Sequence, residues 1–181
     1  MAIPTLNAVG FCAHYSRQGD WAFDYALRLS RNHQLKLNVF HFLTDPYAVD
    51  DSDRVEQLSP EARARLAIER EKELRLYYDQ RAGDYLEVGF RLCDNPEWVE
   101  LHRCLVVREF QLLVLGYVGP DAYFGGRPIT RFADSFVCPV VLVGPDDPRQ
   151  FHLNSQAQLI AASLDLEGAG WAATAAGSAE Q

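Results

Sequence analysis

The sequence predicts an α/β protein with a single doubly wound sheet of five parallel strands, sandwiched by helices. Short apolar runs recur along the chain, and each gap between them is long enough for a helix. Helix start signals such as Ser59-Pro60 stand in these gaps. Strands that alternate with helices pair in parallel through right-handed crossovers, and helices then cover both faces of the sheet.

The five predicted strands are the apolar segments, which are typical of strands buried on both faces. They cover residues 6–13, 35–43, 85–92, 112–115 and 139–143. In a sheet of this type the ligand crevice lies at the carboxyl ends of the strands, where the winding direction reverses.

Four helices are predicted between these strands, over residues 21–32, 60–82, 97–110 and 130–136. Asp20, Ser59 and Asn95 are the predicted N-caps, and proline follows the last two at the favoured first position. Gly83 is the predicted end of the second helix. The acidic segment 45–58 is predicted to be an exposed loop.

The length of 181 residues suggests one domain with an appendage. We assign residues 1–145 to the domain and 146–181 to a C-terminal extension, partly helical and with a disordered end. Asn154 or Ser155 would cap a helix that reaches about residue 166. The extension either packs on the domain or a dimer partner, or begins a second domain of the same kind.

Charge and cysteine content exclude several classes of protein. The net charge of −8 argues against binding to nucleic acid or to an anionic membrane. The first residues do not resemble a signal peptide, and no apolar run approaches the ~20 residues that span a bilayer. The four cysteines form no C-x-x-C pair, which indicates free thiols in a reducing compartment. A cytoplasmic location follows.

A glycine-rich loop links the last two predicted strands, in the segment QLLVLGYVGPDAYFGGRPITRFADSFVCPVVLVGP (111–145). A strand end that meets such a loop and a helix N-terminus is where α/β proteins hold phosphates. Gly116 and Gly119 allow close backbone approach, and Arg127 offers a guanidinium to an anion. The simpler alternatives are a tight turn, a loop tip at Gly125-Gly126 and an exposed charge.

The order of these elements resembles the universal stress protein family over residues 6–144. The resemblance rests on the G-x-x-G loop after the fourth strand, the final strand CPVVLV, the small residues Ala22 and Ala26, and His41-Phe42 at the end of the second strand. It implies a five-stranded parallel sheet. Many members of the family bind ATP, others do not, and many dimerise through the last strand.

The family writes its nucleotide loop as G-x2-G-x9-G-[Ser/Thr], and the chain departs from it in the second half. Gly116 and Gly119 match, but the third glycine falls on Gly126, and Arg127 takes the place of the Ser/Thr. Enforcing the nine-residue spacing moves these two positions to Ile129 and Thr130. At the end of the first strand, His14 stands where the family commonly has Asp.

These positions define a candidate nucleotide or anion site, for ATP or another adenine nucleotide in an altered crevice. It comprises His14, Phe42, Leu115, Gly116, Gly119, Gly126, Arg127 and Thr130. Cys12, His14 and His41 also invite a metal site, but they lack ligand spacing, so we assign no metal. No nucleophile motif is present, and we assign no catalytic residue.

We therefore expect a non-enzymatic universal-stress-type protein that dimerises through the strand at Val140–Val143. The alternative is a ligand-free interaction module for a protein partner, its crevice filled by Tyr117, Phe124 and His14. A third hypothesis is a slow nucleotide hydrolase.

Overall fold

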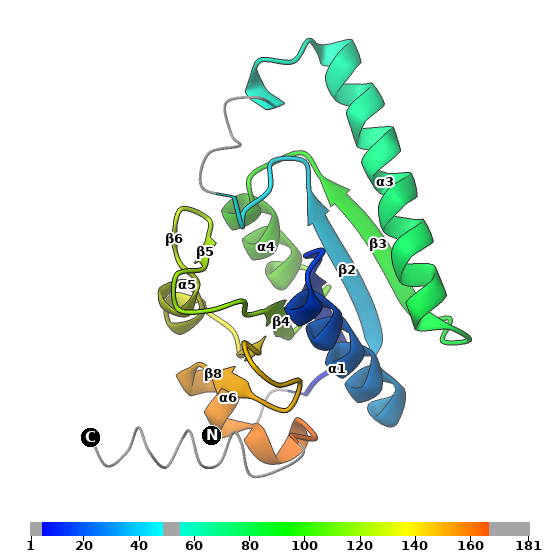
Figure 1. Ribbon diagram of the computed structural model, residues 1–181. Helices are drawn as coiled ribbons and strands as arrows, with labels where there is room; N and C mark the ends of the chain where they lie inside the picture. The colour runs from blue at the N-terminus through cyan, green and yellow to red at the C-terminus, as the bar shows by residue number, and fades with distance from the viewer. Residues whose placement is uncertain (1–4, 49–54, 167–181) are drawn as a thin grey trace.

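A six-stranded sheet forms the centre of the fold in the computed structural model, which describes residues 5–48 and 55–166 (Figure 1). Its strand order is β3-β2-β1-β4-β7-β8, and every pair is parallel except β7–β8. The strands are β1 (Ala8–Cys12), β2 (Lys36–Phe42), β3 (Val88–Cys93), β4 (Leu112–Gly116), β7 (Val140–Val143) and β8 (Phe151–Leu153). The predicted fold class is confirmed, and its five parallel strands gain an antiparallel sixth.

Helices cover both faces of this sheet. They are α1 (Arg17–His33), α3 (Pro60–Ala82), α4 (Glu97–Val106), α5 (Ile129–Ser135), α6 (Ser155–Leu159) and a 3₁₀ turn, η1 (Ala161–Ser163). One apolar cluster joins α1, α3 and α6 to one face, and a second joins α4 and α5 to the other. In Figure 1, α3 runs alongside β3. None of the helices in the described ranges is long and apolar enough to cross a membrane.

Helix α1 begins earlier than its sequence predicts. Ser16 is the N-cap, and its Oγ accepts a hydrogen bond from the Gly19 amide at 2.9 Å. Asp20, the predicted cap, lies in the first turn and accepts a hydrogen bond from the Tyr77 hydroxyl at 2.5 Å. Two good capping residues stand four positions apart, and the earlier one makes the cap.

Helix α3 begins and ends as predicted, with Ser59 as its N-cap and Gly83 as its C-cap. Helix α4 does not. Pro96 holds the N-cap position, while the Asn95 side chain donates to Glu100 Oε1 at 2.7 Å. This helix ends at Val106 rather than at residue 110, and Arg108 follows with a positive φ of 64°.

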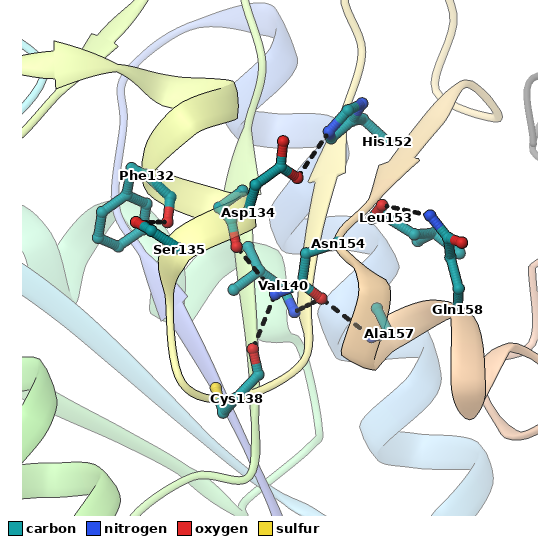
Figure 2. Close-up of polar contacts among 11 residues, drawn as sticks. Phe132, Asp134, Ser135, Cys138, Val140, His152, Leu153, Asn154, Ala157 and Gln158 are labelled. Atoms are coloured by element: carbon teal, nitrogen blue, oxygen red, sulfur yellow. Dashed lines mark hydrogen bonds and ion pairs between the residues drawn. The ribbon is translucent and has the colours of Figure 1, made fainter. Parts of the chain in front are cut away.

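The antiparallel strand β8 is held in place by Asn154, which is 1% exposed (Figure 2). Its Oδ1 accepts from the Val140 and Ala157 amides at 3.0 and 2.9 Å. Its Nδ2 donates to the Ala133 and Cys138 carbonyls, both at 2.9 Å. One side chain therefore caps α6 and ties it to α5 and β7, with all four of its hydrogen bonds made.

Residues 146–166 pack against the rest of the domain. Phe151, Ile160 and Leu164 belong to the same buried apolar cluster as β1 and α1, and the Tyr25 hydroxyl donates to the Leu164 carbonyl at 2.7 Å. Residues 159–166 form no strand of a second domain. The predicted disordered end, residues 175–181, lies outside the described residues.

The pairing of β8 also corrects the predicted dimer contact. Strand β7 pairs with β4 along one edge and with β8 along the other. Because both edges of Val140–Val143 are occupied, a second chain cannot pair with this strand while β8 is in place.

Candidate functional site

The winding direction of the sheet reverses between β1 and β4, and the carboxyl ends of these strands define the candidate crevice. The first turn of α1 packs directly against the end of β4. A Cβ placed on Gly116 would lie 2.7 Å from the Gly19 nitrogen and 2.8 Å from the Gln18 carbonyl carbon. Gly116 is thus required for helix-to-strand packing, a role that neither the predicted phosphate contact nor the predicted tight turn described.

The second pair of glycines in the loop forms a β-hairpin. Strands β5 (Tyr123–Phe124) and β6 (Arg127–Pro128) pair antiparallel, with Phe124 opposite Arg127. Gly125 and Gly126 form the two-residue turn, with φ of 63° and 81°. Positive φ at both central residues is the pattern of the type I′ turn that favours glycine in tight hairpins. The shortened loop therefore folds on itself at Gly126.

A column of aromatic rings occupies the region between the ends of β1 and β2 and this hairpin. His14 stacks on Tyr47 with ring centroids 4.1 Å apart, Tyr47 contacts Phe124 at 5.0 Å, and Phe124 contacts Phe132 at 4.5 Å. The Tyr47 hydroxyl donates to the Cys12 carbonyl at 3.3 Å. Side chains of the chain itself thus fill space beside His14, the residue predicted to meet a ligand.

Burial lowers the pKa of His14, although Asp45 opposes this shift. His14 Nδ1 lies 2.7 Å from Ser16 Oγ, a distance that a nucleophile and its base would also show. The same Ser16 Oγ accepts the cap hydrogen bond from the Gly19 amide, and a hydroxyl can accept this bond and still contact His14. We interpret the His14–Ser16 pair as part of the helix cap.

The remaining predicted site residues do not converge. Phe42 and Leu115 are buried in the cluster beneath α4 and α5, and Thr130 is half-buried on α5. Gly119 faces open space, since a Cβ there would meet nothing within 4 Å. Gly126 lines one cavity and Arg127 another, and neither cavity is lined by His14, Gly116 or Gly119. Neither of these two cavities therefore brings the predicted anion-site residues together.

Sequence reasoning missed a second group of rings on the opposite face of the sheet. Tyr15 lies 5.8 Å from His41 and 6.2 Å from Tyr78, measured between ring centroids. The Nε2 of His41 and the hydroxyl of Tyr78 are buried, and neither has a hydrogen-bond partner among the residues that the structure describes. Burial and the nearby Arg70 lower the pKa of His41 to about 4, so this imidazole is neutral at pH 7.

Within the described ranges, no three His, Cys, Asp or Glu side chains gather closely enough to hold a metal ion. All four cysteines are buried and unpaired. Burial raises the pKa of each thiol above its ordinary value, which disfavours the reactive thiolate.

The larger of the two cavities, about 330 Å³, lies between the loop that follows β2, the start of α3, residues 94–97 and the hairpin tip. Asp45, Glu56 and Glu97 line it, and its Arg63 is paired with Asp94 at 2.7 Å. This acidic lining is unsuited to phosphate groups.

No protein-family model and no curated protein matches the sequence. Among solved structures, a universal stress protein in complex with cAMP aligns with 79% of this chain and 100% of its own, at TM-score 0.51 and 18% identity. A hypothetical protein, PH0823, aligns over 78% and 97%, at TM-score 0.53 and 15% identity. The universal stress protein UspA from Lactobacillus plantarum aligns over 76% and 97%, at TM-score 0.48 and 18% identity. The chain has the universal-stress-protein-like fold.

Proposed function

We propose that this chain is a universal-stress-type protein that acts without catalysis, as an interaction module. Its nucleotide crevice is closed by its own side chains. The observation that carries the proposal is the stack of Tyr47 on His14 beneath the Gly125-Gly126 hairpin. Of the three rings expected to fill the crevice, His14 and Phe124 belong to this column, while Tyr117 lies near His152 instead.

The proposal excludes an ordinary ATP site for two physical reasons. A triphosphate needs several backbone amides and cations around it, and two of the three glycines that would form its loop, Gly116 and Gly126, serve helix packing and a hairpin turn. An aromatic base needs an open slot to stack in, and Tyr47 already covers one face of His14.

A second candidate function is binding of an adenine nucleotide in a different pose. It is favoured by the cAMP-bound protein of the same fold and by the open space beside Gly119. This function would require Tyr47 to leave the crevice, because no nucleotide can share its position.

The buried, unpaired cysteines support a reducing compartment, and we propose that the protein acts in the cytoplasm. The proposal includes no pairing of chains through β7, because β8 covers that edge.

Calorimetric titration with ATP, ADP, AMP and cAMP at millimolar concentration tests the closed crevice. We expect no heat of binding from the unmodified protein. A second measurement is mass spectrometry of the denatured recombinant protein, which we expect to release no nucleotide. Saturable heat from any of the four ligands, or a co-purified nucleotide, overturns the closed crevice in favour of the second candidate.

A further inference from the structure

A cavity of about 270 Å³ opens between α4, α5 and the tip of the β5–β6 hairpin, away from the crevice at the ends of β1 and β4. Its lining combines four aromatic side chains with three polar ones. The aromatic residues are Trp98, His102, Phe132 and Phe136, and the polar residues are Glu97, Arg127 and Ser135. Figure 2 shows Phe132 and Ser135 on the side of α5 opposite Asn154.

The aromatic walls favour a flat apolar ligand. Phe136 contacts His102 edge-to-face at 5.3 Å and Phe132 at 5.2 Å, so these rings have defined positions. Trp98 is 64% exposed although its indole is large and apolar. A planar ligand in the cavity would remove part of this surface from water and stack against the rings.

Arg127 supplies a positive charge that the fold does not use. Its Nη1 lies 3.4 Å from Ser135 Oγ, and among the described residues no carboxylate lies within salt-bridge distance of it. The Ser135 hydroxyl donates to the Phe132 carbonyl at 3.1 Å and accepts from Arg127, so the guanidinium fork alone provides the adjacent donors that suit a carboxylate.

Glu97 restricts how much negative charge the cavity accepts. Its carboxylate lies against the hairpin tip, since a Cβ on Gly125 would be 2.5 Å from its Oε1. A ligand with several negative charges would be repelled by Glu97, whereas a single charge directed toward Arg127 would not. The volume of this cavity lies somewhat below the roughly 300 Å³ of the smallest usual ligand pockets. The ligand is therefore limited to one or two fused rings.

We propose that this cavity binds a small aromatic acid, with its ring between Trp98 and Phe136 and its carboxylate on the Arg127 guanidinium. The site shares Phe132 with the aromatic column of the closed crevice but includes neither His14 nor Tyr47, and it goes beyond the proposed function. A protein whose nucleotide crevice is closed would in this way still respond to a metabolite.

The test uses 1-naphthylacetate and its neutral analogue 1-naphthylacetamide as probes, with the full chain and titration calorimetry. We expect the acid to bind at least fivefold more tightly than the amide, because only the acid accepts charge-assisted hydrogen bonds from Arg127. The substitution Arg127→Ala should remove this preference. Arg131→Ala is the matched control, because Arg131 is an exposed arginine of α5 that does not line the cavity.

The substitution Trp98→Ala should weaken acid and amide alike, by about tenfold, because it removes a wall rather than a charge. Circular dichroism establishes that each variant keeps the fold. The proposal is overturned by equal affinities for acid and amide, by the absence of saturable binding of the acid, or by an Arg131→Ala effect as large as that of Arg127→Ala.

Discussion

The buried His41 predicts a loss of stability as the pH falls below neutral. Its pKa is about 4 in the folded protein, below the ordinary 6.5, because burial and the nearby Arg70 disfavour the charged imidazole. The unfolded chain binds a proton near pH 6.5 and the folded protein does not. The free energy of unfolding is therefore unaffected by His41 protonation above pH 6.5, and it decreases as the pH falls from 6.5 toward 4.

The magnitude follows from the difference between the two pKa values. The pKa values of about 4 in the folded protein and 6.5 in the unfolded chain correspond to about 3 kcal/mol in the free energy of unfolding. About 2 kcal/mol of this amount is lost by pH 5. His14, whose pKa is also lowered by burial, adds a loss of the same sign. A control variant is therefore needed to isolate His41.

The control is His41→Leu, which has no proton to bind and leaves no buried Nε2 without a partner. Urea unfolding of both proteins, followed by circular dichroism between pH 7.5 and 5, gives the free energy of unfolding at each pH. We expect the variant to lose about 2 kcal/mol less than the unmodified protein over this range. Parallel losses in the two proteins would refute the assignment of a neutral, buried His41.

Asn154, Gly116 and Tyr47 give three further predictions. Asn154→Ala leaves four buried backbone groups without their partner and should lower the free energy of unfolding in urea by about 3 kcal/mol. The control, Gln158→Ala, removes only the hydrogen bond from the Gln158 amide to the Leu153 carbonyl and should cost under about 1 kcal/mol. Equal effects of the two substitutions would contradict the role of Asn154. Gly116→Ala places a Cβ against the backbone of α1 and should cost about 1–3 kcal/mol by the same assay, while an unchanged unfolding midpoint would show that α1 is free to shift. Tyr47→Ala opens the slot beside His14 but restores no phosphate cradle, so calorimetry should detect binding of adenosine, which has no phosphate, in this variant alone; binding by the unmodified protein as well would show that Tyr47 does not close the crevice.

The sequence was sufficient for the parallel sheet because buried strands appear as apolar runs and helices begin at capping residues. Ser59 and Gly83 mark both ends of α3, as predicted. Strand β8 was missed because three residues, Phe-His-Leu, show no periodicity of their own. Their extended conformation depends on pairing with β7 and on the Asn154 side chain, and both are tertiary contacts.

The candidate site was less predictable, for a similar reason. Two adjacent glycines between Phe124 and Arg127 carry a hairpin signal that the family pattern obscured. The contact between His14 and Tyr47 has no signature in the sequence. It arises because β1 and β2 pair with Cys12 opposite Phe40, which brings the residues after each strand to the same end of the sheet.

The late position of β8 in the chain has a consequence for synthesis on the ribosome. Until residues 151–164 leave the exit tunnel, β7 has an uncovered edge made of four apolar residues, Val-Val-Leu-Val. Such an edge pairs readily with other extended chains, so a nascent or proteolysed product that stops near residue 145 would be prone to aggregate. A recombinant version cut at that point should accumulate in inclusion bodies, whereas one that ends after residue 166 should remain in solution.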